Sequence, residues 1–367
     1  MTISLFKAQL DVDAVLDELR PILESGWVGL GPKTRQLELE LAQYVGAEHV
    51  VATSSCTAAL QLALHALYLP RGSVVLTTPI SFASTAMVCL SEGLEVRFCD
   101  VEPDTGNLDA SKLEEAIERH RPKALIVVHL GGYPCDMHAI NHLAKRHWLP
   151  VIEDCAHALG SSYFSEPVGS GGNIYCYSFH AVKNLPTADG GAVASESAVV
   201  AERMRRLRWL GIDKSTADRS GTSGGYSWEY EIEEAGFKAH MNDLSAVLGL
   251  VGMRTLEAGN SRRRAIASRY ASEIVAGTPP DYSPLRKSSS HFLPMHFGDR
   301  AAVIRRLEAA GIQYGMHYKP LYRFGPFAGE PLPGAEAYAS TELTLPMHLG
   351  LSDEDVSAVI DAVNWRV

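Results

Sequence analysis

Short apolar runs alternate along the first 200 residues with longer segments in which apolar residues recur at helical spacing. Four of these runs are Val74–Leu76, Glu95–Phe98, Ala124–Val128 and Pro150–Ile152. Helical spacing marks the segments between them, at 83–90, 110–119 and 137–147. Because this alternation is typical of strand–helix–strand units, it predicts an α/β fold: a mainly parallel sheet with helices on both faces.

Beyond residue 240 the pattern becomes mainly helical. It predicts helices over 243–256, 261–275, 301–310 and 353–363, and one strand around 292–295. The polar, glycine-containing stretch 213–227 predicts a loop. For a chain of 367 residues we therefore expect two domains. Residues 1–255 would form a large αβα sheet domain with an N-terminal arm, and residues 256–367 a small C-terminal α+β domain.

The charge pattern disfavours nucleic acid as the main partner. The formal net charge is −10, whereas phosphate binding needs clustered Lys and Arg. The two short basic clusters, Arg203–Arg206 and Arg262–Arg264, are interpreted mainly as solvated helix faces. Contact between one of these arginines and a nucleotide diphosphate is the alternative. No apolar run reaches 18 residues, so we expect no membrane span. The start, Met1–Lys7, lacks the pattern of a signal peptide.

The six cysteines are scattered and include no CxxC pair, and no HExxH motif occurs. This spacing argues against a zinc site. Several of the cysteines stand in apolar segments, which is typical of reduced, buried thiols in a cytoplasmic protein.

Lys183 is the first candidate for chemistry. It follows the strand-like stretch Asn173–Tyr177, and Gly190–Ala194 beyond it reads as another strand. A partly desolvated lysine can lose its proton near neutral pH and form a Schiff base with an aldehyde cofactor such as pyridoxal phosphate. A solvated surface lysine is the alternative, so the interpretation depends on partners elsewhere in the chain.

Asp154 would be such a partner, because it stands where the apolar strand at Val151–Ile152 ends. Ligands of open α/β sheets bind outside the carboxyl ends of the strands. A carboxylate there can pair with a protonated pyridine nitrogen and keep the ring electron-poor. His157 could stack on that ring or reach its phenolic oxygen. Alternatively, Asp154 caps a following helix.

A phosphate site is predicted where the strand-like residues 50–53 run through Ser54–Thr57 into the helical pattern 58–64. Free backbone N–H groups and the helix dipole favour an anion at such a terminus. Ser55 and Thr57 would add hydroxyl donors. Plain helix capping by these residues is the alternative.

Taken in order, these motifs resemble the nucleotide-sugar aminotransferases of the DegT/StrS type, which are fold-type I pyridoxal phosphate enzymes. The resemblance runs from about residue 20 to the C-terminus. The matching segments are Trp27–Pro32, Ser54–Leu60, Ser81–Ala86, Val128–Gly132, Glu153–His157, Ser178–Asn184, Gly236–Asp243 and His317–Leu321.

The resemblance implies a role for each site residue. Lys183 would be the Schiff-base lysine, Asp154 the partner of the pyridine nitrogen, and His157 a neighbour of the phenolic oxygen. Phe82 would stack on the ring. The phosphate would lie in the segment Ser55, Cys56, Thr57 and Ala58, together with Ser178.

Two positions depart from the family pattern. Cys56 replaces a usual glycine, so the phosphate turn must tolerate a Cβ. Lys238 stands where many members have an asparagine that reaches the phosphate from the partner subunit, and a lysine could act there as a point charge. The resemblance also implies a homodimer with shared active sites.

The expected reaction moves an amino group from glutamate or glutamine to a nucleotide-linked keto-sugar. His180, His317 and Tyr318 are candidate sugar-pocket residues, with packing at the domain junction as the alternative for the last two. A cyclitol ketone, or another carbocyclic antibiotic precursor, is the alternative acceptor. A non-enzymatic regulator on the same fold is disfavoured by the presence of Lys183 and Asp154. A Rossmann dehydrogenase is disfavoured because residues 29–34 do not complete GxGxxG.

Overall fold

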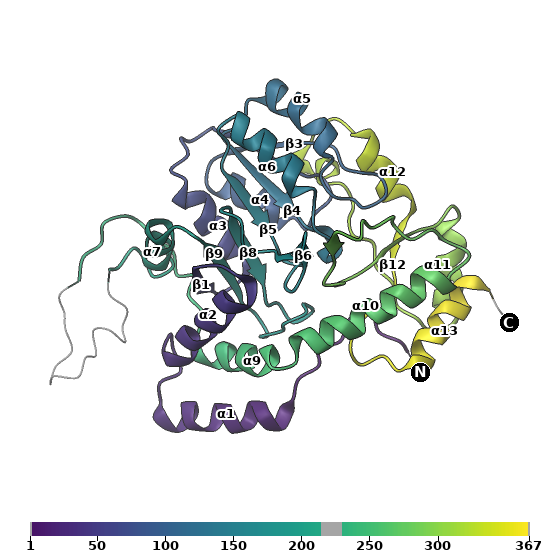
Figure 1. The fold of residues 1–367 in the computed structure, drawn as a ribbon, viewed down its shortest axis with the longest axis horizontal. Coiled ribbons are helices and arrows are strands. Elements are labelled where there is room, and N and C mark those ends of the chain that lie inside the picture. The colour runs from purple at the N-terminus through teal and green to yellow at the C-terminus, as the bar shows by residue number, and fades with distance from the viewer. Residues whose placement is uncertain (1, 214–229, 366–367) are drawn as a thin grey trace.

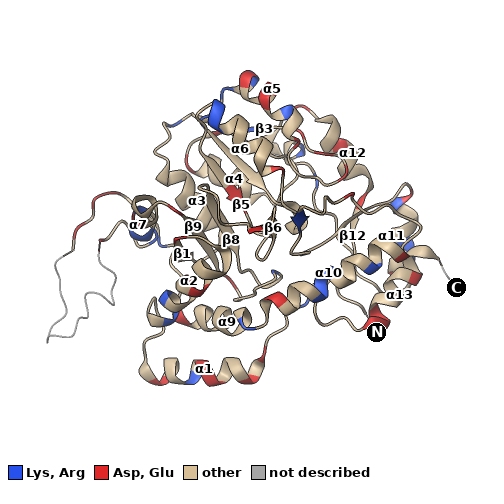
Figure 2. Cartoon of the chain, viewed as in Figure 1, with Lys and Arg blue, Asp and Glu red and all other residues tan. Residues whose placement is uncertain are grey.

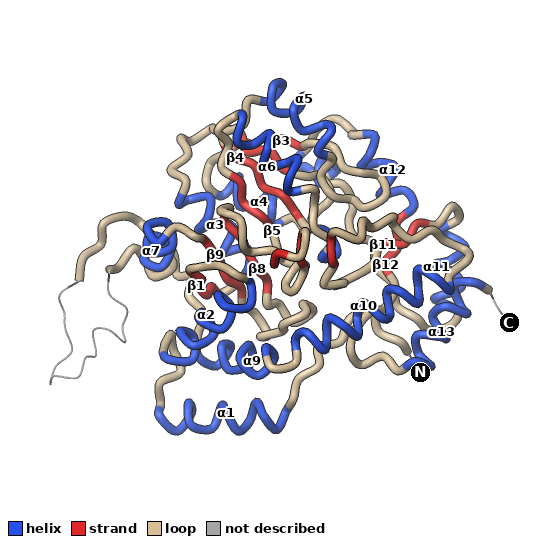
Figure 3. Tube along the Cα trace, in the orientation of Figure 1, coloured by secondary structure: helices blue, strands red, loops and turns tan. Residues whose placement is uncertain are grey.

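A computed structural model describes residues 2–213 and 230–365. The loop predicted over 213–227 therefore lies, apart from Asp213, outside the described residues. Strands occupy the middle of the molecule and helices surround them (Figure 3).

Within the described residues, seven strands form the main sheet in the order β1-β9-β8-β5-β4-β2-β3 (Figure 1). Their bounds are β1 His49–Thr53, β2 Val74–Thr77, β3 Glu95–Phe98, β4 Ala124–Val128, β5 Val151–Asp154, β8 Ile174–Ser178 and β9 Gly191–Ser195. Strand β9 pairs antiparallel with β1 and β8, and the other neighbouring pairs are parallel. The prediction of a mainly parallel α/β sheet is confirmed.

Helices cover both faces of this sheet because side chains alternate along each strand. In β4, Ile126 packs with α3 and α7, whereas Leu125 and Val127 pack with α5 and α6. Helices α2 and α9 cover the β1–β9 end of the second face. The helix bounds are α2 Pro32–Val45, α3 Cys56–Ala66, α4 Ser84–Ser91, α5 Ala110–His120, α6 Met137–Arg146, α7 Ala198–Leu207 and α9 Asp243–Met253.

The hydrophobic pattern did not predict the two N-terminal helices, α1 (Val12–Ser25) and α2. Helix α2 begins with Pro32 and has no cap from its own preceding side chain. Instead the Asp243 carboxylate, at the start of α9, accepts the N–H groups of Gly31 (2.9 Å) and Thr34 (2.9 Å). A cap supplied from more than 200 residues away leaves no local signal in the sequence.

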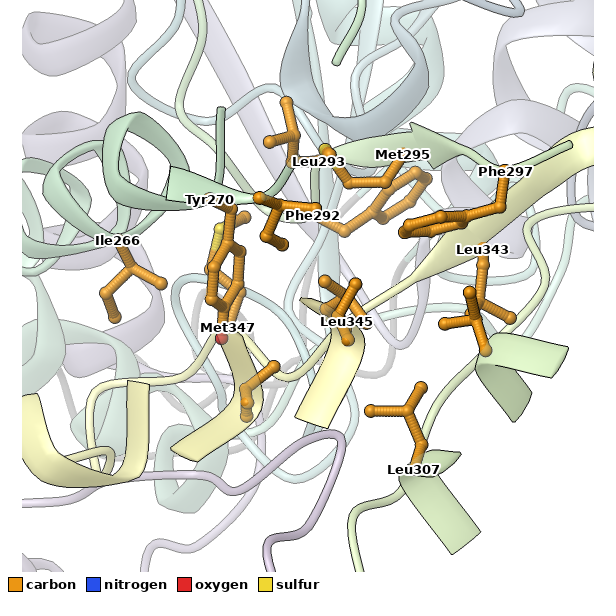
Figure 4. Close-up of a cluster of buried hydrophobic side chains, with 14 of the residues drawn as sticks. Ile266, Tyr270, Phe292, Leu293, Met295, Phe297, Leu307, Leu343, Leu345 and Met347 are labelled. Carbon is orange, nitrogen blue, oxygen red and sulfur yellow. The ribbon is translucent and has the colours of Figure 1, made fainter. Parts of the chain in front are cut away.

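The C-terminal part forms a smaller α+β unit beside the sheet. Helix α10, Leu256–Glu273, begins five residues before the predicted start, so that prediction was too short. The remaining elements are β11 Pro294–His296, α11 Arg300–Ala309, α12 Pro333–Thr341, β12 Glu342–Thr344 and α13 Asp353–Asn364. Strands β11 and β12 pair antiparallel, and buried apolar side chains fill the space beneath them (Figure 4). The boundary at residue 255 stays a prediction.

Two arginines contradict the prediction of solvated basic faces. Arg203 is 7% exposed and lies 2.6 Å from the Glu234 carboxylate, and Arg263 is 6% exposed within α10. The prediction failed for these two arginines because each lies on the helix face that packs against the rest of the protein. Elsewhere, positive and negative residues are interspersed along the helices (Figure 2). Among the described helices, none is long and apolar enough to cross a membrane.

Candidate active site

The site lies where the parallel strands of the sheet end. Asp154 is the last residue of β5 and Ser178 the last of β8. The register pairs Asp154 with Val128 of β4 and with Cys176 of β8, so these three strand ends lie side by side. Lys183 follows in a turn, where its backbone N–H donates to the carbonyl oxygen of His180 (2.8 Å). The structure therefore places Lys183 and Asp154 at the same edge of the sheet.

Asp154 is buried, and each of its carboxylate oxygens accepts a hydrogen bond from an O–H or N–H group. The Thr85 hydroxyl donates to Oδ2 (2.7 Å) and the Ala156 N–H to Oδ1 (3.1 Å). Burial raises the pKa of Asp154, and the bond from Thr85 opposes this. The next element along the described chain is strand β6, Ser162–Tyr163, so Asp154 does not cap a helix. Thr85 is a site residue that the sequence reasoning missed, although it lies in the segment 81–86 that was singled out.

The amine of Lys183 is largely desolvated. Burial lowers its pKa to about 8, while the nearby Cys56 and Asp154 oppose that shift. At pH 7 roughly a tenth of these amines are then unprotonated. The neighbouring Asn184 donates to the Asn260 side chain (2.7 Å) and to the carbonyl oxygen of Ser289 (3.1 Å). Residues from the C-terminal part thereby fix the segment that carries the lysine, a role the sequence reasoning also missed.

The predicted phosphate segment lies at the N-terminus of α3. Ser55 caps this helix by accepting the Ala58 N–H (3.1 Å), Thr57 is exposed, and Ala58 is half-buried. Gly191 links the segment to Ser178, its partner in the β8–β9 register. A Cβ at Gly191 would lie 2.5 Å from the Cys56 nitrogen, so only glycine permits this approach.

Cys56 directs its side chain away from this terminus. Its Sγ lies 3.6 Å from the Cys176 carbonyl oxygen and 3.9 Å from Asp154 Oδ1, and the residue belongs to the core beneath α3. Burial raises the pKa of the thiol well above its ordinary value. The turn thus accommodates a Cβ at this position without filling the anion site.

His157 is a buried, neutral ring. It stacks on His291 at 4.8 Å, and its Nε2 lies 3.4 Å from the Tyr318 hydroxyl. Burial, with the charge of Lys183, lowers its pKa well below the ordinary value. Its Nδ1 is enclosed without a hydrogen-bond partner among the described residues. Since buried polar groups are normally paired, this nitrogen has a hydrogen-bonding capacity that the described residues leave unused.

Further aromatic and histidine side chains lie near His157 and Lys183. Phe82 is 63% exposed and its ring lies 6.4 Å from that of Tyr318. His317 stacks on Phe292 at 4.7 Å, while His180 is exposed on the turn before the lysine. The structure brings His317 and Tyr318 near His157 and also packs them against Phe292 and Phe82. Their role in a sugar pocket stays a prediction.

Lys238 lies outside this group within the described chain. Its Nζ stands 3.4 Å above the Trp209 ring, and it borders a cavity of about 810 Å³ that Trp27 and His240 also line. The backbone next to it does reach the phosphate segment, because Ser54 N–H donates to the Ala239 carbonyl oxygen (2.7 Å).

These residues fit pyridoxal phosphate. Asp154 is a buried carboxylate able to pair with a cation, and His157 Nδ1 has no hydrogen-bond partner in the part of the chain that the structure describes. The N-terminus of α3 and a lysine of lowered pKa lie nearby. The fold and site define a pyridoxal phosphate-dependent aminotransferase of fold type I.

Comparison with known proteins supplies the family. The model of the DegT/DnrJ/EryC1/StrS aminotransferase family matches residues 10–364, and the chain belongs to that family. The spore coat polysaccharide biosynthesis protein SpsC of Bacillus subtilis is 37% identical over 365 residues, covering 95% of this chain and 93% of SpsC.

Solved structures agree with this assignment. The sugar aminotransferase CalS13 from Micromonospora echinospora superposes with a TM-score of 0.90 at 30% identity, with 99% of each chain covered. Spr1654 from Streptococcus pneumoniae, in its PLP form, gives a TM-score of 0.91 at 30% identity over 100% of this chain and 98% of its own. Spr1654 is also known in its PMP form. The chain is thus a member of a sugar aminotransferase family.

Proposed function

We propose that this enzyme transfers the amino group of glutamate or glutamine to a keto-sugar carried by a nucleoside diphosphate. The observation that carries the proposal is the convergence of a lysine of lowered pKa with a buried carboxylate at one sheet edge. The polysaccharide role named for SpsC and the sugar activity named for CalS13 support a sugar acceptor.

Each predicted residue has a role in this proposal. Asp154 holds the protonated ring nitrogen, Phe82 covers one ring face, and His157 offers Nδ1 to the phenolic oxygen. Cofactor phosphate is held at the N-terminus of α3 by Ser55, the backbone of Cys56, Thr57 and Ala58, with Ser178 beside them. When bound, the cofactor supplies an aldehyde that carries the amino group and a ring that withdraws electrons.

Lys183 performs the proton chemistry. Its amine would hold the cofactor and, once a substrate amine has displaced it, would take the proton from the donor's α-carbon and return it in the 1,3-proton shift. Burial keeps a share of the amine unprotonated near neutral pH, as a general base requires. His180, His317 and Tyr318 line the acceptor side and orient the sugar.

We further propose a homodimer in which Lys238 reaches the partner's cofactor phosphate. Its ammonium lies over the Trp209 ring of its own chain and borders a cavity lined by Trp27 and His240. The six free cysteines are all buried, which is compatible with the reducing cytoplasm.

The proposed acceptor can be tested by spectroscopy. Enzyme in the pyridoxamine form is mixed with candidate nucleotide keto-sugars and, separately, with cyclitol ketones. A nucleotide keto-sugar should restore the absorbance of the pyridoxal form within the mixing experiment. Restoration by cyclitol ketones alone would replace the proposed acceptor with the carbocyclic one.

A further inference from the structure

The imidazole of His317 is partly buried, and its two nitrogens differ in their hydrogen bonds. Its backbone N–H donates to Glu342 Oε2 (2.8 Å), its Nδ1 lies 2.8 Å from the Thr344 hydroxyl, and Tyr338 donates to its carbonyl oxygen (2.9 Å). Its Nε2 has no hydrogen-bond partner among the described residues, and it is not one of the enclosed atoms. The free nitrogen is therefore available to a ligand.

The hydroxyl of Thr344 connects this ring to a buried carboxylate. Thr344 donates its single proton to Glu342 Oε1 (2.7 Å). While it does so, its oxygen can only accept from His317, so Nδ1 carries the ring proton. With Glu342 ionised, Nε2 therefore presents a lone pair to the site.

Protonation of Glu342 reverses the chain. Oε2 already accepts the backbone N–H of His317, so the added proton belongs on Oε1, where it donates to Thr344. Thr344 then donates to Nδ1, and the ring proton stands on Nε2. The same histidine now offers an N–H to the site.

We propose that Glu342 and Thr344 are positioning residues that decide whether His317 Nε2 donates or accepts a hydrogen bond toward the substrate. This inference rests on the proposed function, in which two substrates occupy one site in turn. The carboxylate of an amino-acid donor can only accept, so it requires the N–H form. A sugar hydroxyl can donate, so it fits the lone-pair form.

The exchange balances with one proton. A proton from the site binds Nε2, the Nδ1 proton passes to the Thr344 oxygen, and the Thr344 proton passes to Glu342 Oε1. One N–H bond forms at Nε2 and one breaks at Nδ1, while the O–H bond of Thr344 is broken and remade. The ring stays neutral and Glu342 becomes the neutral acid.

The pKa shifts of Glu342 and His317 are consistent with this hydrogen-bond chain. Burial raises the pKa of Glu342 to about 7, so it is protonated below that pH and ionised above it. Burial and the charge of Lys183 lower the pKa of His317 to about 4, so the imidazolium form is disfavoured. The titratable and charged groups around the pair are Arg300, His296, Tyr318 and Tyr338 near Glu342, and Lys183, His157 and His291 near His317.

Nitrogen-15 NMR of the full-length protein labelled in histidine tests the proposal, with and without pyridoxal phosphate. The His317 signals are those missing in His317→Gln. In the wild type, Nδ1 should be protonated at pH 8.5 and Nε2 at pH 6. In Glu342→Gln, the amide oxygen must face the His317 N–H, so its NH₂ donates to Thr344 and Nε2 stays protonated at both pH values.

Two substitutions of Thr344 separate the hydroxyl from its volume. Thr344→Ser should keep the wild-type change with pH, whereas Thr344→Val, similar in size, should lose it. A wild-type ring with one tautomer at both pH values, or a Val variant that still switches, overturns the proposal.

Rates of the two half-reactions add a functional readout. Above pH 7 the wild-type rate with the amino donor should fall about tenfold per pH unit relative to Glu342→Gln, as one ionisation requires. Equal pH profiles contradict the inference. If no keto-sugar is accepted while the tautomer still follows Glu342, the proposed function fails and the hydrogen-bond chain stands.

Discussion

Two buried carboxylates, Asp154 and Glu342, each begin a hydrogen-bond chain that runs through a threonine. The two chains differ in the residue at which they end. Asp154 accepts from Thr85, whose oxygen lies 2.7 Å from Ser81, and Glu342 accepts from Thr344, whose oxygen lies 2.8 Å from His317. Burial raises the pKa of both acids. The first chain ends in a hydroxyl and can only hold its carboxylate in place. The second ends in an imidazole, so its protonation can be read out at the substrate.

Asp154 and Glu342 belong to two different regions of the molecule. The sheet-end group (Asp154, Ser178 and Lys183) stands at strand ends of the large sheet, and in the proposed function it holds the cofactor. The C-terminal wall (His317, Tyr318, Glu342 and Thr344) includes two residues of β12, and in the proposed function it contacts the substrates. Changes in the first should abolish the reaction, whereas changes in the second should tune it.

Lys183→Ala should have the largest effect. It removes the group that moves the proton, so keto-acid release from an amino donor should fall by at least about 10³-fold. Steady-state assays with glutamate and glutamine measure this. As a control, Lys319→Ala replaces the exposed lysine that follows Tyr318, and its rate of keto-acid release should stay within about twofold of the wild type.

Asp154→Asn should lower kcat by about 10²-fold or more, because a neutral amide no longer stabilises a protonated ring nitrogen. The free energy of unfolding should not fall by more than about 1 kcal/mol at pH 7. Because burial raises the pKa of Asp154, its ionised form lowers the free energy of unfolding at pH values above the ordinary pKa of an aspartate. Urea titration tests the fold, and a wild-type rate in this variant would contradict the assigned role.

Capture of pyridoxal phosphate by the apoprotein should depend on pH through Lys183. Only the unprotonated amine attacks an aldehyde, and its pKa is about 8. The second-order rate constant should therefore rise about tenfold per pH unit up to pH 8 and level off above it. Stopped-flow absorbance records it, and a rise that continues unchanged to pH 10 would point to an ordinary solvated lysine.

Glu342→Gln should change how stability depends on pH. The native pKa of about 7 lies above the ordinary 4.5. The stabilisation linked to this acid is therefore complete below pH 4.5 and is lost as pH rises through 7. From pH 5 to pH 8, the free energy of unfolding of the variant should therefore rise by about 1–3 kcal/mol relative to that of the wild type. Denaturation curves at the two pH values measure the difference, and parallel curves would contradict it.

Tyr318→Phe should have the smallest effect. It removes one hydroxyl, 3.4 Å from His157, and leaves the aromatic packing against Phe82. A loss of about two- to fivefold in kcat/KM is expected, as for one weak hydrogen bond. A loss as large as that of Lys183→Ala would move Tyr318 into the sheet-end group.

The sheet-end group could be predicted from the sequence because its signals are local. Asp154 stands at the end of the apolar run Val151–Ile152, and Lys183 follows the strand-like stretch Asn173–Tyr177. Ser178 was assigned through the family resemblance. The structure bears out the strands of the large sheet that these runs predicted.

The C-terminal wall could be predicted only in part. His317 and Tyr318 were found through a family motif, but nothing near Glu342 or Thr344 indicates that they face His317 across 25 and 27 positions. The same holds for Asn184 and Asn260, and for the cap that Asp243 gives α2. Such contacts depend on how distant segments pack, which periodicity does not encode.

The most direct test of the central claim is borohydride reduction of the purified enzyme with pyridoxal phosphate, followed by peptide mapping. The structure predicts one labelled peptide, carrying the cofactor on Lys183, and no labelling in Lys183→Ala. Labelling of another lysine, or none in a fully loaded wild-type enzyme, would contradict the claim that Lys183 is the centre of the reaction.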